Sequence, residues 1–118
     1  MKYLCLIYYD EKKLDGLPEA ERLAMYREAY AHYDDLVNRG HGLGGEPLES
    51  VEAATTVRVQ GGKTSITDGP YMETKEQLGG FILLEARDLD EAIALAATIP
   101  PARLGGVEVR PIRDMRAK

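Results

Sequence analysis

The chain has 118 residues, and its 15 Lys and Arg against 20 Asp and Glu give a net charge of −5. This length suits a single domain, residues 1–118, with one hydrophobic core. The apolar share of 44% excludes general disorder, and the acidic balance argues against direct nucleic-acid binding, which needs a surplus of Lys and Arg.

The first predicted element is a strand over residues 3–9, whose apolar and aromatic side chains fall on both alternating faces. The run contains the only cysteine, Cys5, so no disulfide and no cysteine metal site can form within the chain. The apolar run before Asp10 is too short for a signal peptide or a membrane span. We therefore expect a cytoplasmic protein without membrane contact.

A long helix is predicted next, starting near Pro18 and ending at Gly40. Its apolar positions recur at three- and four-residue steps and form one stripe, which we expect to face the core. The stripe consists of Leu23, Tyr26, Tyr30, Tyr33 and Val37. His32 lies about 200° round the helix from Tyr30 and is expected to face solvent.

Residues 43–48 give a weak strand signal, and a stronger hairpin signal follows. Strands over residues 55–60 and 63–68 are joined by two glycines, which supply the positive φ angles of a two-residue turn. This turn sets the register, so that Val57 faces Ile66 and Asp68 ends its strand on the same apolar side.

A second strand with apolar residues on both faces spans residues 81–86, a helix follows from Asp88, and a proline-bearing strand covers residues 107–112. This order predicts an α+β fold, a ferredoxin-like split βαβ sandwich with an inserted β-hairpin. Two helices cover only one face of such a sheet. We therefore expect a second copy to cover the other face in a homodimer.

Residues 68–80, with the sequence DGPYMETKEQLGG, resemble the signature segment of the DGPF (DGPFAETKE) family within the YCII-related superfamily. Tyr71 and Met72 stand where that family usually has Phe and Ala. The resemblance implies a dimeric α/β barrel. Because some members accompany or are fused to alternative sigma factors, it also implies a protein partner such as the sigma-factor-associated transcription machinery.

The better-described YCII branch carries a proposed acid–base pair, a His on the first helix and an Asp near the end of the second. In this chain those positions fall at Ala29 or Tyr30 and at about Ile99. Neither chemical group is present, so the resemblance does not carry this pair over.

Asp68 is the candidate catalytic residue. A carboxyl in register with Val57 and Ile66 needs a hydrogen bond, an ion pair or a cavity, and burial favours the protonated form that a general acid uses. The reaction would then be cofactor-independent proton transfer, as in an isomerase or a lyase. In the alternative, Asp68 only caps the turn by accepting hydrogen bonds from the amides of Tyr71 or Met72.

Seven further side chains are candidate ligand contacts: Tyr8, Tyr30, Arg58, Tyr71, Glu73, Lys75 and Glu76. Tyrosine hydroxyls suit a cleft, an arginine suits an anion, and the charged loop after Asp68 could orient a polar ligand. Each also has an ordinary interpretation, as core, surface or solvated loop. We expect no cofactor and no metal, because no nucleotide-binding or metal-ligand spacing occurs.

Two functions remain open from the sequence. The first is a dimeric small-molecule-binding domain with acid–base chemistry near Asp68. The second is a non-enzymatic accessory module that binds a protein partner through its exposed loop and acidic surface.

Overall fold

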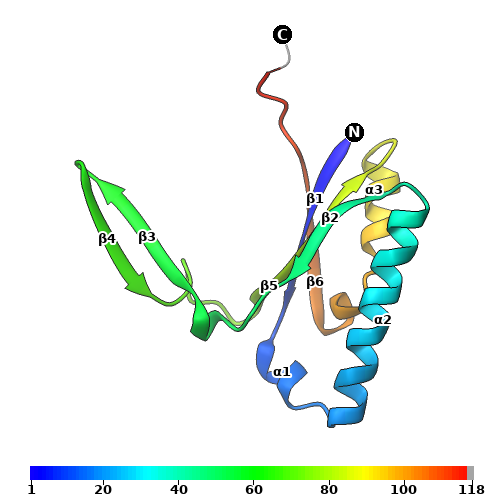
Figure 1. Ribbon diagram of the computed structural model, residues 1–118, viewed down its shortest axis with the longest axis horizontal. Coiled ribbons are helices and arrows are strands. Elements are labelled where there is room, and N and C mark those ends of the chain that lie inside the picture. Colours follow the sequence, from blue (N-terminus) through cyan, green and yellow to red (C-terminus); the bar gives the residue numbers. More distant parts are fainter. Residues whose placement is uncertain (117–118) are drawn as a thin grey trace.

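The computed structural model describes residues 1–116. In chain order its elements are β1 (Lys2–Tyr9), α1 (Glu11–Asp15), α2 (Glu19–Asn38), β2 (Gly42–Pro47), the 3-10 helix η1 (Val51–Ala53), β3 (Thr55–Gln60), β4 (Lys63–Asp68), β5 (Gln77–Glu85), α3 (Leu89–Ala96), the 3-10 helix η2 (Pro100–Leu104) and β6 (Gly105–Pro111). Four strands form an antiparallel sheet in the order β2-β5-β1-β6, with α2 and α3 on the same side of it (Figure 1). This is the predicted mixed α+β arrangement.

The core lies between this sheet and the helices. Side chains alternate along a strand, so one face of β1 places Tyr3, Cys5 and Ile7 against the helices, where all three are buried. The other face of β1 and β5 carries apolar side chains that are only half-buried, namely Leu4, Leu6, Tyr8, Phe81 and Leu83. No helix covers this second face, which we call the open face (Figure 1).

The hairpin of β3 and β4 has the predicted register. Val57 pairs with Ile66 and Thr55 with Asp68, and the turn residues Gly61 and Gly62 have φ of 56° and 77°. Two consecutive positive φ angles suit glycine because no side chain clashes there. The two-residue turn therefore determined the pairing of all six residues in each strand.

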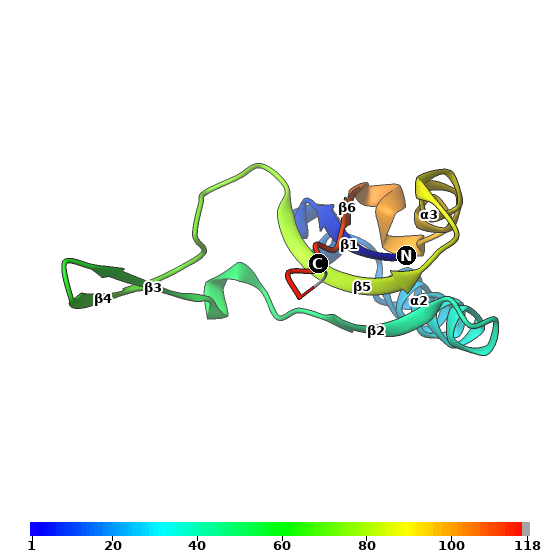
Figure 2. The ribbon, with the colours of Figure 1, turned by 90° about the horizontal axis from the view of Figure 1, so that it is seen from above.

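The hairpin does not pack on the rest of the chain, although its alternating pattern predicted one covered apolar side. It projects as an arm away from the helices (Figures 1 and 2), and Val57 and Ile66 are 57% and 69% exposed. The radius of gyration is 16.1 Å, against about 13 to 14 Å for a compact domain of this length. A lone two-stranded hairpin is marginally stable in water, so this arm needs a further contact.

The long helix α2 is rotated relative to the prediction. Its one fully buried side chain is Leu36, and the inward-facing line runs through Met25, Ala29 and His32. Four of the five residues of the predicted stripe are instead exposed: Leu23 at 40%, Tyr26 at 40%, Tyr30 at 60% and Val37 at 44%. The fifth, Tyr33, is half-buried and packs against the core as predicted. The prediction failed because both lines repeat at three- and four-residue steps, and tyrosine was weighted as a core residue although its hydroxyl can remain in water.

Turn and capping residues in the sequence correctly predicted where several other elements begin or end. Asp68 is followed by Gly69 with φ of 114°, which ends β4 as expected. The side chain of Asp88 accepts a hydrogen bond of 2.9 Å from the amide of Glu91 and so caps α3. Three short elements were missed: the 3-10 helices η1 and η2, and the short helix α1 that the polar link after β1 forms, capped by Asp10. Within residues 1–116 no helix is long and apolar enough to cross a membrane.

Candidate functional site

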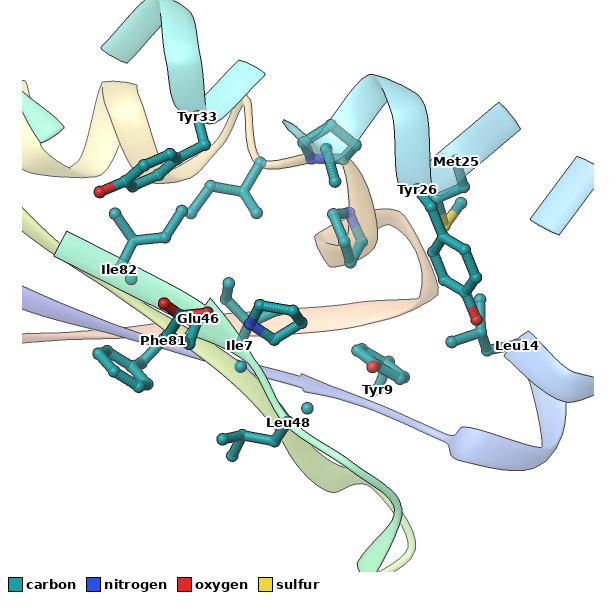
Figure 3. A pocket seen from close by; sticks show the side chains of 18 of the residues that line it. Ile7, Tyr9, Leu14, Met25, Tyr26, Tyr33, Glu46, Leu48, Phe81 and Ile82 are labelled. Carbon is teal, nitrogen blue, oxygen red and sulfur yellow. The ribbon is translucent and has the colours of Figure 1, made fainter. Parts of the chain in front are cut away.

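A cavity of about 790 Å³ lies between α2 and the helix-facing side of the sheet. This volume falls within the range of small-molecule sites. The side chains of Tyr26 and Tyr33 reach from α2 toward the strands, where Tyr9 and Ile82 lie (Figure 3). Leu14 of α1 and Pro100 of η2 also contribute to the lining. We call this space the large cavity.

Contacts at the middle and near the C-terminal end of α2 hold the helix beside the large cavity. Leu36 is 1% exposed, and Arg103 of η2 forms two hydrogen bonds to the carboxylate of Glu28, at 3.0 and 2.6 Å. Around this middle the helix presents Met25 and the small Ala29 to the cavity. A short side chain at the centre of the inward line leaves the space below it unfilled.

A β-bulge in the sheet shapes the floor of the large cavity. β1 and β5 shift register between Ile7 and Tyr8, which leaves Gly79 of β5 without a partner in β1. A Cβ at Gly79 would collide with the ring of Tyr9, so the glycine lets this ring lie flat against the strand. Burial raises the pKa of Tyr9, and the neighbouring Tyr26 and the carboxylates of Glu11 and Asp15 raise it further. The floor is therefore an aromatic surface in a negative environment.

His32 lines the large cavity, against the expectation that it faces solvent. Its Nε2 lies 2.7 Å from Oγ1 of Thr98, and that hydroxyl donates to the carbonyl of Leu95 at 2.7 Å. Because the hydroxyl proton is already used, Nε2 must carry a proton and donate to Thr98. Nδ1 is then an acceptor, and it is buried without a hydrogen-bond partner within residues 1–116.

A lower pH should destabilise the folded protein because His32 becomes protonated. Burial lowers the pKa of His32 and outweighs the attraction of Asp35, so the unfolded chain binds the proton more readily than the folded one. Stability should therefore fall as the pH drops below about 6.5, the ordinary pKa of imidazole. The measurement is the urea midpoint of wild type and His32→Gln from about pH 7.5 to about pH 5. If the difference in urea midpoint between wild type and His32→Gln stayed the same across this pH range, the role given to His32 would be contradicted.

A smaller cavity of about 500 Å³ lies where the arm joins the sheet. Tyr8 and Leu78 come from the sheet, Val51 from η1, and Tyr71 and Met72 from the segment after Gly69. The guanidinium of Arg58 stacks on the ring of Tyr71, 4.5 Å from its centre. We call this space the arm-root cavity.

The structure divides the residues predicted from the sequence. Tyr30 lines the large cavity, and Tyr8 and Tyr71 line the arm-root cavity. Five residues are exposed and line neither cavity: Arg58, Asp68, Glu73, Lys75 and Glu76. The roles assigned to all of these residues remain predictions, but within one protomer they do not form a single cluster.

Sequence reasoning missed Met25, Ala29 and His32 because it chose the wrong face of α2. The signal that indicates this face is Leu36, an aliphatic residue that continues the same line at three- and four-residue steps. Ala29, Tyr30 and Ile99, the positions assigned above to the acid–base pair, all line the large cavity. No group of three or more metal-ligating side chains is close enough to hold an ion in the part of the chain that the structure describes.

Comparison with known proteins agrees with this architecture. The family model of the YCII-related domain matches residues 1–116. An uncharacterised protein of Rhizobium meliloti (strain 1021) is 36% identical over 114 residues, which cover 95% of this chain and 92% of the relative.

Among solved structures, 5-chloro-2-hydroxyhydroquinone dehydrochlorinase from Burkholderia phenoliruptrix AC1100, in complex with 2,5-dihydroxybenzoquinone, is similar with a TM-score of 0.57. The match covers 98% of this chain and 97% of that chain at 17% identity, and so shows a shared fold. From the family match and the sequence identity to the relative, the chain belongs to the YCII-related family.

Proposed function

We propose that this protein binds a small organic molecule in the large cavity. The observation that carries the proposal is the cavity itself, a space of about 790 Å³ whose walls include the rings of Tyr9, Tyr26 and Tyr33. Predominantly apolar and aromatic walls with a few polar groups are typical of ligand sites. The structural neighbour, in complex with a small ring compound, supports a ligand of this size for the shared fold.

The acid–base part of the proposal needs a second copy. Asp68 is exposed and lies outside both cavities, so within one protomer it does not meet a ligand in the large cavity. A dimer in which the arm of one copy reaches its partner would bring Asp68 and its neighbours to another molecule. The alternative function, an accessory module for another protein, is favoured by the same exposed arm.

Three aromatic probes of nearly equal size test the binding proposal: benzyl alcohol, benzylammonium and benzoate. We expect at least one to bind in calorimetric titrations, and Tyr26→Ala to weaken it about threefold to tenfold through the lost ring contact. Tyr71→Ala is the matched control, because Tyr71 lines only the arm-root cavity. Binding of none of the probes, or weakening by Tyr71→Ala alone, would contradict the proposal.

A further inference from the structure

The large cavity has an unbalanced charge. Four acidic residues of its lining can present carboxylates there: Glu11, Asp15, Asp34 and Glu49. Glu46 is also in the lining, but it pairs with Phe81, so its side chain lies on the open face. The lining contains no Lys or Arg, although the chain has fifteen of them. A ligand that enters the cavity therefore meets negative charge without a compensating positive side chain.

Most of these carboxylates are also unpaired. Within residues 1–116, the side chains of Asp15, Asp34 and Glu49 form no ion pair. Glu11 accepts hydrogen bonds of 2.9 Å from Ser50 and from the amide of Val51, which are neutral donors. Acids outside the cavity differ, since Asp35 lies 2.9 Å from Arg39 in an ion pair. The negative charge of the cavity is thus available to a ligand.

The aromatic walls add a second attraction for positive charge. Tyr9, Tyr26, Tyr30 and Tyr33 contribute to the lining, and the face of a tyrosine ring attracts a cation. Tyr26 and Tyr9 lie at the end of the cavity beside Leu14, as Figure 3 shows. The carboxylates are too scattered in the described residues to form a group that could hold a metal ion, which favours a larger, organic cation.

We propose that the large cavity selects a positively charged organic molecule, an amine or quaternary ammonium compound whose apolar body packs on the tyrosines. This inference rests on the proposed function and names its ligand class. An anionic ligand, a carboxylate or a phosphate, would find no cationic side chain in the lining and would be repelled by the carboxylates.

The three probes separate charge from shape because they share a phenyl ring and differ mainly in charge at pH 7. Benzylammonium should bind at least about tenfold more tightly than benzyl alcohol, and benzoate should have the lowest affinity of the three. Added sodium chloride should weaken benzylammonium binding while leaving benzyl alcohol unchanged, because salt screens exposed charges.

Neighbouring residues on α2 provide a matched pair of variants. Asp34 lines the cavity and Asp35 does not, so Asp34→Asn should weaken benzylammonium about threefold while Asp35→Asn leaves it unchanged. The double variant Asp15→Asn/Asp34→Asn should lose about tenfold. Benzyl alcohol should bind all of these variants equally.

The possible failures are distinguishable. If benzyl alcohol or benzoate binds wild type as tightly as benzylammonium, the charge inference is overturned and the proposed binding function stands. If Asp35→Asn weakens benzylammonium as much as Asp34→Asn does, the effect is one of net charge and the inference is also overturned. If none of the probes binds, both the inference and the function fail.

Discussion

Ala29→Trp should abolish ligand binding in the large cavity while the protein remains folded. Ala29 lies on the inward line of α2, in the cavity lining, and an indole at this position would occupy the ligand's space. The loss should be at least about 100-fold, because a ligand would have to displace a side chain already packed on aromatic walls. The measurement is a calorimetric titration with the probe that wild type binds most tightly.

Ala31→Trp is the matched control. Ala31 is exposed on α2 and does not line the cavity, and the helix-propensity cost of Trp relative to Ala is at most about 0.7 kcal/mol for both variants. The chain has no natural tryptophan, so each variant reports its own environment by fluorescence. Ala29→Trp should emit at a shorter wavelength than Ala31→Trp. Equal emission, or unchanged binding by Ala29→Trp, would contradict the position of the cavity.

Leu83→Asp should separate a homodimer into folded protomers. We propose that two copies pack open face to open face, because Leu4, Leu6 and Leu83 are only half-buried there and no helix covers them. Leu83 pairs across the sheet with Leu4 and Gly44, so neither of its direct partners offers a positive charge to the new carboxylate. Burying an unpaired carboxylate costs several kcal/mol, which weakens association about 100-fold or more.

Sedimentation measures this outcome. Wild type should sediment at micromolar concentration with twice the 13.1 kDa of one chain, and Leu83→Asp with the mass of one. Ile93→Asp provides the control, because Ile93 is half exposed on α3, on the helix side of the sheet. A wild type that sediments as a single chain, or dissociation by Ile93→Asp instead, would show that the open face is not the interface.

Most of the fold could be predicted from the sequence because its signals are local. The glycine pair in the hairpin turn determined the pairing from Thr55↔Asp68 to Gln60↔Lys63. Strands with apolar residues on both faces became the two central strands, β1 and β5. The placement of the arm could not be predicted. The alternating apolar residues Val57 and Ile66 indicate that one side of the hairpin is covered, but they do not indicate which part of the chain, or which other molecule, covers it.

The candidate site was less accessible to sequence reasoning. It depends on the rotation of α2, and two competing lines of residues differ there by about one position. It also depends on acids from distant segments, such as Asp15 after β1 and Glu49 after β2, which look like ordinary surface residues in the sequence. Only the folded chain shows that they share one cavity.

The four methionines allow the central claim, ligand binding in the large cavity, to be tested directly. Met25 lines the large cavity, Met72 lines the arm-root cavity, and Met1 and Met115 line neither. In a ¹H–¹³C spectrum of protein labelled at the methionine methyl groups, titration with benzylammonium should shift the Met25 signal to saturation and leave the other three in place. Movement of Met72 alone, or no movement of Met25 at millimolar benzylammonium, would contradict the account.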